Sequence, residues 1–302
     1  MLEVARMKFF WICILLVLLA ACSNRTDELD LSAYKYNDTK NMIRFVHTAA
    51  NKLEMGGIKA LAEYRNPRGS KSDYYLYVYD MNGLNLFHAG MPEMENKNFL
   101  DIIDKDGKYP IHMVLEAIQN PENPHGWIHY SWWEPGKFYP VPKSSCHFKV
   151  TLPDGRKVFI GCGINFPLEE GEFARIAVDS AVNLIEATGS AAIPLIADAK
   201  SSYNFREVKV FAFRANGSIL ISPVLGDSLF RANLLSCMDE VGHKPFEHAL
   251  QQLEQSDAVW QIFMGKSRYE RQLEKKVLYL RKTMLDNEPL FVGAITDLPQ
   301  TP

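Results

Sequence analysis

The sequence has little net charge and lacks the common patterns for nucleic-acid binding, metal binding and catalysis. Its 302 residues carry a formal charge of −3, and nucleic acid is not expected as a partner because its binding needs a strongly basic surface. None of the eight histidines follows a His-Glu-x-x-His or closed zinc spacing. No nucleophile has a base beside it. We therefore expect neither an enzyme nor a protein that holds a metal or another cofactor.

Long apolar runs are also scarce, and the clearest one is at the N-terminus. Arg6 and Lys8 precede an unbroken apolar segment from Phe9 to Ala21. This segment is shorter than the roughly 20 apolar residues that a membrane-spanning helix needs. A short basic region before such a segment is typical of a secretory signal. No later stretch is apolar enough to predict a membrane span.

The apolar segment ends in Leu19-Ala20-Ala21-Cys22, with small residues directly before a cysteine. This resembles the bacterial lipobox, which implies cleavage before Cys22 and a lipid on its sulfur. The alternative is an ordinary secretory signal in which Cys22 is incidental. Because Ser23-Asn24 follows without an acidic residue, lipoprotein sorting favours the outer membrane. We expect a signal peptide at 1–21, a lipidated cysteine and polar tether at 22–40, and a location in the cell envelope on the periplasmic face.

Three of the five cysteines remain after the signal and the lipid site are set aside. Cys146 and Cys162 flank Leu152-Pro153-Asp154-Gly155-Arg156, which is typical of a type I turn with a glycine bulge. If Leu152 faces Arg156, the same register places Cys146 opposite Cys162. Two alternatives follow, a disulfide in an oxidising compartment or two buried free thiols.

The chain repeats itself weakly at a spacing of about 133 residues. Each copy has a helical pattern, a strand, an Asn-Gly turn, a return strand, a short helical pattern and later strands. The corresponding helical patterns, strand pairs and turns are 41–64 with 173–199, 75–79 with 208–213, 82–83 with 216–217, 84–88 with 218–222, and 111–119 with 246–255.

This repeat predicts an α+β fold of two tandem units, each an antiparallel sheet flanked by helices with a long N-terminal helix. Both periodicities break near Phe166 to Glu172, where Pro167 and an acidic run occur. We therefore expect a first unit at 41–165 and a second, degenerate unit at 166–302.

Short motifs between Tyr75 and Ile164 carry a resemblance to a known family. They are Tyr77-Val78-Tyr79-Asp80-Met81-Asn82-Gly83, Asn98-Phe99-Leu100, Asp104-Lys105-Asp106-Gly107-Lys108, Gly126-Trp127-Ile128-His129-Tyr130, Pro142-Lys143-Ser144-Ser145 and Gly161-Cys162-Gly163-Ile164. They resemble the Cache family of extracellular sensor domains, which implies a PAS-like fold and a small-metabolite ligand such as a carboxylate or an amino acid. The second unit looks like a degraded copy, with Lys275-Lys276 where the first has Pro142-Lys143.

The densest candidate site is the aromatic-rich segment from Trp127 to Lys143. In a strand, Tyr130 and Trp132 point to the same side. A small anion needs aromatic walls, one cation and a few donors. We expect Lys143 to be the cation and Tyr130 and Trp132 to form the wall.

The resemblance places the ligand between these strands, a hairpin and a helix. Tyr77, Tyr79 and His88 on the hairpin and His112 on the helix are then expected to close the pocket. The alternative is that the aromatic residues are ordinary core and that Lys143 is a solvated surface residue.

Two functions from different classes follow from these observations. The first is a lipid-anchored binding protein that holds a small carboxylate or similar metabolite and acts as an accessory sensor for a membrane signalling partner. The second is a structural or interaction lipoprotein of the envelope that has no small-molecule ligand.

Overall fold

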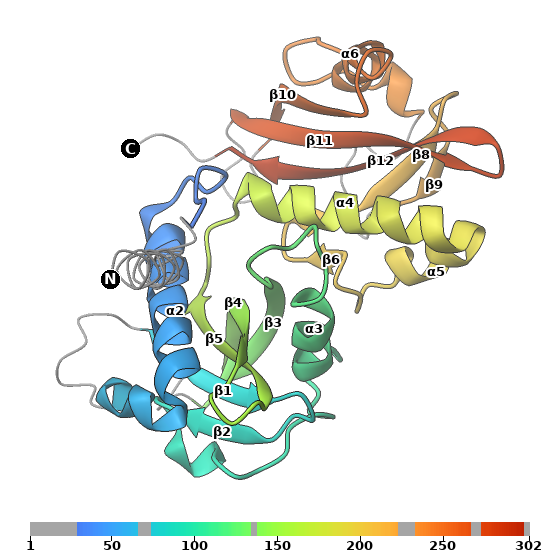
Figure 1. The fold of residues 1–302 in the computed structure, drawn as a ribbon. Helices are drawn as coiled ribbons and strands as arrows, with labels where there is room; N and C mark the ends of the chain where they lie inside the picture. The colour runs from blue at the N-terminus through green and yellow to red at the C-terminus, as the bar shows by residue number, and fades with distance from the viewer. Residues whose placement is uncertain (1–28, 66–73, 134–137, 223–232, 267–272, 299–302) are drawn as a thin grey trace, which may run out of the picture. The chain divides into compact units, whose positions relative to one another are not determined.

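Helices alternate with antiparallel strands along the chain, as the hydrophobic pattern predicts (Figure 1). The computed structural model describes residues 29–65, 74–133, 138–222, 233–266 and 273–298. The expected signal peptide, its lipidated Cys22 and the first part of the tether lie outside these residues. From Ala33 onward the chain forms one compact unit.

The first sheet has five antiparallel strands in the order β2-β1-β5-β4-β3. Its elements are α2 (Asn37–Gly56), the 3-10 helix η1 (Ile58–Arg65), β1 (Tyr77–Asp80), β2 (Asn85–His88), η2 (Pro92–Met94), α3 (Pro110–Ala117), β3 (Ile128–Trp133), β4 (Pro140–Thr151) and β5 (Lys157–Asn165). The expected hairpin around Asn82-Gly83 is confirmed by the pairing of β1 with β2.

The second sheet repeats this order, since β9-β8-β12-β11-β10 matches the first sheet strand for strand. The elements of this half are α4 (Gly171–Thr188), η3 (Gly189–Ala191), α5 (Ala192–Ala197), β6 (Asn204–Phe205), β7 (Val208–Lys209), β8 (Phe211–Arg214), β9 (Ile219–Ile221), η5 (Leu234–Ser236), α6 (Pro245–Gln252), β10 (Ala258–Lys266), β11 (Leu273–Leu285) and β12 (Glu288–Asp297). Strands β6 and β7 pair with each other in a separate two-stranded sheet. The predicted α+β class with two antiparallel sheets flanked by helices is therefore confirmed.

The duplication extends to single hydrogen bonds. The buried Asp104 carboxylate accepts backbone N–H groups from Asp106, Lys108 and Ser131 at 2.8–2.9 Å. This arrangement fastens the loop before α3 to strand β3. In the second half Asp239 makes the equivalent bonds, to the N–H groups of Val241, His243 and Met264 at 2.8–3.0 Å.

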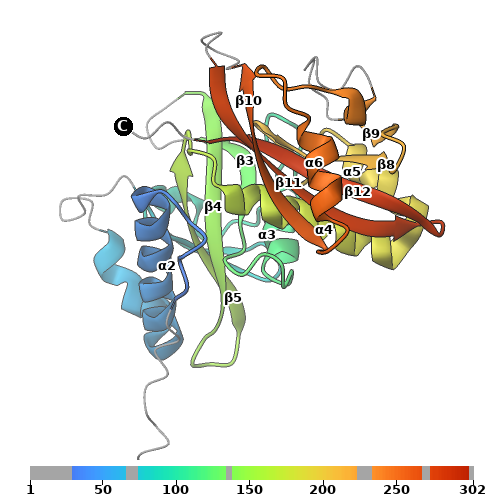
Figure 2. The same ribbon diagram turned by 90° about the horizontal axis from the view of Figure 1, so that it is seen from above.

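Helix α2 covers one face of the first sheet because its apolar residues recur at helical spacing. Its residues Met42, Ile43, Val46 and Leu53 are fully buried, and the helix packs on β4 and β5 (Figure 2). It ends at Gly56 and is capped by Gly57, whose positive φ of 66° suits glycine. Helix α3 lies on the opposite face, so the first sheet is enclosed between two helices (Figure 1).

Helix α4 occupies the matching position on the second sheet, where it packs on β11 and β12. By length and composition alone, the segment Gly171–Ala197 could cross a membrane, so the expectation that no later stretch is apolar enough was wrong. In the structure its Arg175 forms ion pairs with Glu172 and Asp179. A buried apolar face beside paired charges is typical of a core helix.

The β4–β5 hairpin has the predicted register, with Cys146 directly opposite Cys162. Both are free, buried thiols, which is the second of the two alternatives. Directly opposed strand residues meet the distance for a disulfide without always meeting its dihedral angle. Burial raises the pKa of the Cys162 thiol to about 12 and that of Cys146 well above its usual value. Neither thiol therefore forms the reactive thiolate near neutral pH.

Candidate functional site

One face of the first sheet carries an unusual set of buried polar side chains, and we call it the polar face. Strand pairing places opposed residues on the same side of an antiparallel sheet. The pairs Tyr77 with His88, Tyr130 with Lys143, and His147 with Gly161 define this side. The residues of this side that we include in the polar face are Tyr77, Tyr79, Asn85, His88, Tyr130, Trp132, Lys143, Ser145, His147, Gly161 and Gly163. The apolar Ile128, Val141 and Phe159 lie on the same side.

Two glycines of β5 make room for the polar side chains. A Cβ on Gly161 would lie 2.3 Å from His147 Cδ2, and one on Gly163 would lie 2.2 Å from Ser145 Oγ. Real Cβ atoms do not approach other heavy atoms this closely. The imidazole and hydroxyl groups therefore occupy space that any other residue on β5 would fill.

We expect Gly161→Ala to lower the free energy of unfolding by about 1–3 kcal/mol, because the added methyl overpacks a filled site. Gly171→Ala is the matched control, since its Cβ would meet Trp260 at an ordinary 3.5 Å. Denaturant unfolding of both variants measures the difference. Equal stabilities would show that the polar face is loosely packed.

Lys143 is the cation of the polar face. Its side chain is buried, with 2% exposure, so the alternative of a solvated surface lysine is wrong. Its Nζ donates a hydrogen bond to the Tyr75 hydroxyl and lies 4.0 Å from the centroid of that ring. Cation–π contact of this kind stabilises an ammonium group that has left water.

The histidine and tyrosine side chains of this face form hydrogen bonds that bear on their protonation. The His147 ring lies 2.7 Å through Nδ1 from the Gly126 carbonyl, so Nδ1 donates and Nε2 accepts from the Tyr77 hydroxyl at 2.9 Å. Burial, with a smaller contribution from the Lys143 charge, lowers the pKa of His147 to about 4 and that of His88 to about 3. Burial raises the pKa of Tyr130 to about 12. At neutral pH, Lys143 is therefore the charged group among the polar-face residues named here.

The structure brings together six of the seven residues expected at the ligand site. Four aromatic residues share one buried cluster: Tyr77, Tyr79, Tyr130 and Trp132. His88 stacks on Tyr77 with ring centroids 5.9 Å apart, and Lys143 acts electrostatically on His88.

His112 is the exception, and its expected role in closing the pocket is not supported. Half of its side chain is exposed, and it pairs with Asp101 at 3.1 Å. Helix α3 buries Pro110, Ile111, Val114 and Ala117. Successive helical residues turn by about 100°, which directs position 112 to solvent.

Sequence reasoning missed several members of the polar face, above all Asn85. Its side chain is fully buried, and neither its amide nitrogen nor its amide oxygen has a hydrogen-bond partner among the described residues. Burying an amide without a partner is unfavourable by about 1–3 kcal/mol. The sequence indicated this residue through the predicted hairpin, in which Asn85 lies opposite Tyr79.

The corresponding face of the second sheet is apolar. Register places Phe211, Phe213, Phe263, Leu278 and Leu280 where the first sheet has Tyr77, Tyr79, Tyr130, Ser145 and His147. These five residues form a hydrophobic core with α6.

One cation is common to both sheets, but its surroundings differ. Lys276 corresponds to Lys143 and forms an ion pair with the carboxylate of Asp297. Asn165, which bears no charge, lies opposite Lys143 in the first sheet. The second sheet therefore supplies its own anion at the position where the first sheet has an amide.

The family comparison matches the part of the chain that contains the first sheet. Residues 34–164 match the Single Cache domain 2 family model. We call these residues the Cache segment. It covers less than half of the chain and includes every residue of the polar face. No curated protein sequence matches the chain.

Among solved structures, the chain is similar to a methyl-accepting chemotaxis protein from Vibrio parahaemolyticus RIMD 2210633, with 27% sequence identity and a TM-score of 0.34. The similarity covers 42% of this chain and 84% of that chain. A Cache chemosensory domain described for carboxylic acid recognition has 23% identity, 43% and 94% coverage, and a TM-score of 0.36. The ligand-binding domain of the Pseudomonas aeruginosa PAO1 amino acid chemoreceptor PctB has 10% identity, 86% and 81% coverage, and a TM-score of 0.30.

Proposed function

We propose that the Cache segment binds a small carboxylate at the polar face and that the protein acts as a lipid-anchored accessory sensor for a membrane partner. In this proposal Lys143 meets the carboxylate, and the Tyr130 hydroxyl donates a further hydrogen bond, while the Tyr77 hydroxyl stays bonded to His147. Tyr79 and Trp132 form the apolar wall, and the unpartnered Asn85 amide meets a polar part of the ligand.

The contrast between the two sheets is the observation that carries the proposal. In the second sheet the equivalent face is a hydrophobic core, and its lysine is matched by Asp297. The first sheet keeps hydroxyl, imidazole, amide and ammonium groups in the same positions. Buried polar groups lower stability unless they are fully paired, so their retention on one sheet favours a ligand there. The match to the Single Cache domain 2 family supports the same role.

The test is a thermal-shift screen of small acids, amino acids and amines on the form that begins at Ser23. A carboxylate at 100 times its dissociation constant is expected to add about 2.7 kcal/mol to the free energy of unfolding. Lys143→Met should abolish this gain because the cation is removed. Lys149→Met, at an exposed position further along the same strand, is the matched control and should retain the gain. The proposal fails if no acid shifts the transition or if both variants respond equally.

Asn165→Asp gives a second test that adds a group instead of removing one. It would place a carboxylate opposite Lys143, as Asp297 lies opposite Lys276. We expect carboxylate affinity to fall at least about 10-fold, because the new anion competes for the cation. Asn165→Gln is the uncharged control, and isothermal titration calorimetry measures both affinities. An unchanged affinity in Asn165→Asp would place the ligand away from Lys143.

The lipid anchor is a separate part of the proposal and has its own test. We expect cells fed a labelled palmitate to incorporate the label into the protein. The labelled protein should then be found in the outer-membrane fraction. Cys22→Ala should remove the label, and Cys237→Ala should leave it. Label retained in Cys22→Ala would exclude the anchor at that residue.

A second function, a scaffold in an envelope complex, is favoured by the close packing of the polar face. Tyr130, Trp132 and Lys143 have exposures of 9%, 6% and 2%. A ligand would therefore have to displace side-chain contacts such as that of Lys143 with Tyr75. An absence of any thermal shift, together with co-purification of an envelope protein on the intact chain, would support the scaffold.

A further inference from the structure

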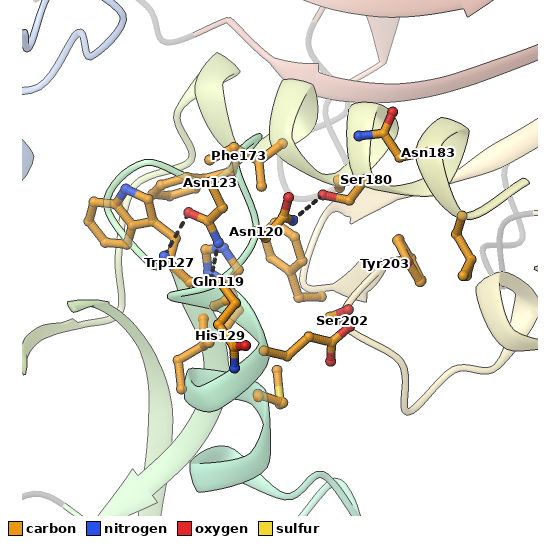
Figure 3. A pocket seen from close by; sticks show the side chains of 18 of the residues that line it. Gln119, Asn120, Asn123, Trp127, His129, Phe173, Ser180, Asn183, Ser202 and Tyr203 are labelled. Carbon is orange, nitrogen blue, oxygen red and sulfur yellow. Dashed lines mark hydrogen bonds between the residues drawn. The ribbon is translucent and has the colours of Figure 1, made fainter. Parts of the chain in front are cut away.

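A separate cavity of about 490 Å³ lies between the Cache segment and helix α4. Figure 3 shows its walls, with α4 on one side and the end of α3 and the start of β3 on the other. The loop that carries Ser202 and Tyr203 closes a third side. This volume is in the range of small-molecule sites. None of the residues assigned above to the carboxylate site lines it.

Aromatic rings form the inner wall of this cavity. His129 stacks on Phe205, with centroids 3.6 Å apart and an interplanar angle of 6°. Phe173 meets the His129 ring edge-on at 4.7 Å and packs against Trp127 at 4.9 Å. The wall is therefore rigid and apolar, and it offers a surface against which the C–H groups of a ligand can pack.

Most polar groups of the lining are amides and hydroxyls, and some of them already form hydrogen bonds within the protein. The Asn120 amide donates to Ser180 Oγ at 2.7 Å. Both polar atoms of the Asn123 side chain bond the backbone of Trp127 (Figure 3). These bonds hold the wall in shape.

Other lining groups are available to a ligand. Among the described residues, the Tyr203 and Ser202 hydroxyls make no hydrogen bond, and Asn183 makes a long one of 3.5 Å to Glu122. Burial raises the pKa of Tyr203 to about 12, with a smaller contribution from Glu116, so its hydroxyl remains a donor.

The lining has almost no charge. Of the described residues that line the cavity, Glu116 alone carries a charge at neutral pH, because burial lowers the pKa of His129 well below its usual value. There is thus no cation to hold a carboxylate or a phosphate. A lining of rings, amides and hydroxyls suits an uncharged ligand that has several hydroxyl groups.

We propose that this cavity is a second binding site, for a neutral polyhydroxylated molecule of mono- or disaccharide size. The C–H faces of this ligand pack on the wall of Phe205, Phe173 and Trp127. The hydroxyl groups of the ligand form hydrogen bonds with Tyr203, Ser202 and Asn183. The ligand contacts α3 and β3 on one side and α4 on the other, so it joins the Cache segment to the second half of the chain.

Saturation-transfer NMR and calorimetry on the full chain test this site with glucose, galactose, maltose and sorbitol as neutral probes. At least one is expected to bind. Ala187→Trp should weaken its affinity at least 10-fold, because Ala187 is exposed on α4 and lines the cavity. Ala191→Trp makes the same change at an exposed position outside the lining and should leave affinity unchanged. Tyr203→Phe, which keeps the ring, should weaken it about 3- to 10-fold.

Charged probes and the Lys143→Met variant separate this site from the carboxylate site. Lys143→Met should bind the neutral probe with wild-type affinity, whatever happens to carboxylates. The inference is overturned if no neutral probe binds, if Ala187→Trp binds as well as Ala191→Trp, or if putrescine competes for the cavity more strongly than any sugar.

Discussion

Asp104→Ala is expected to lower the free energy of unfolding by about 3–5 kcal/mol. The buried carboxylate accepts three backbone N–H groups, and its loss leaves these donors unpaired away from water. Such a loss is a large part of the 5–15 kcal/mol by which a domain is usually stable. Denaturant unfolding, followed by fluorescence and circular dichroism, measures the change.

The duplicated Asp239 is the matched comparison, because it accepts the same three kinds of donor in the second half. Asp239→Ala should have a similar effect, and Asp154→Ala, in an exposed turn, should change stability by less than about 0.5 kcal/mol. A loss below 1 kcal/mol for Asp104→Ala would mean that water replaces the carboxylate without penalty.

Acid is expected to destabilise the protein between pH 7 and pH 5 through His88 and His147. Both are neutral in the folded state, with pKa values of about 3 and 4, whereas an unfolded histidine titrates near 6.5. The unfolded chain therefore binds more protons as the pH falls through 6.5, and stability is lost toward the folded pKa values. Together the two residues contribute a loss of about 3–4 kcal/mol over this range.

Comparison of the wild type with His147→Gln isolates the histidine contribution. Between pH 7 and pH 5, the free energy of unfolding of the variant should fall by about 2 kcal/mol less than that of the wild type. Its stability at pH 7 is expected to be lower, because the substitution changes two hydrogen bonds. Glu169 acts in the opposite direction, since burial raises its pKa to about 7 and it takes up a proton in the folded state. Parallel pH profiles for the two proteins would exclude a neutral buried His147.

Local sequence signals predicted most of the fold. The Asn-Gly pairs predicted both hairpins, and the Pro-Asp-Gly turn predicted the register of β4 and β5 residue by residue. The helical patterns predicted at 41–64 and 173–199 each contain a long helix, although α2 ends at Gly56 and α4 at Thr188, before the predicted patterns do. These features depend on backbone conformation within a few residues, which is the scale on which sequence patterns are informative.

The candidate site was predicted less completely, because it depends on contacts across strands. Alternation within β3 correctly grouped Tyr130 with Trp132. The same rule, applied through the hairpin register, would have added Asn85, Ser145 and His147. His112 was misplaced because the phase of α3 relative to the sheet is set by tertiary packing. The cavity beside α4 joins residues from 113 to 205, and no local pattern predicts such an encounter.

The two glycines of β5 have a consequence for motion. Because they admit hydroxyl and imidazole groups to the interior, the first sheet gains less from exclusion of water than the second, whose matching face is hydrocarbon apart from the Lys276–Asp297 pair. Sub-global opening is therefore expected to begin in the first half, with faster amide exchange in β1 and β5 than in β8 and β12. A bound ligand would slow that exchange. Ligand binding would therefore change how often the first half of the molecule opens locally.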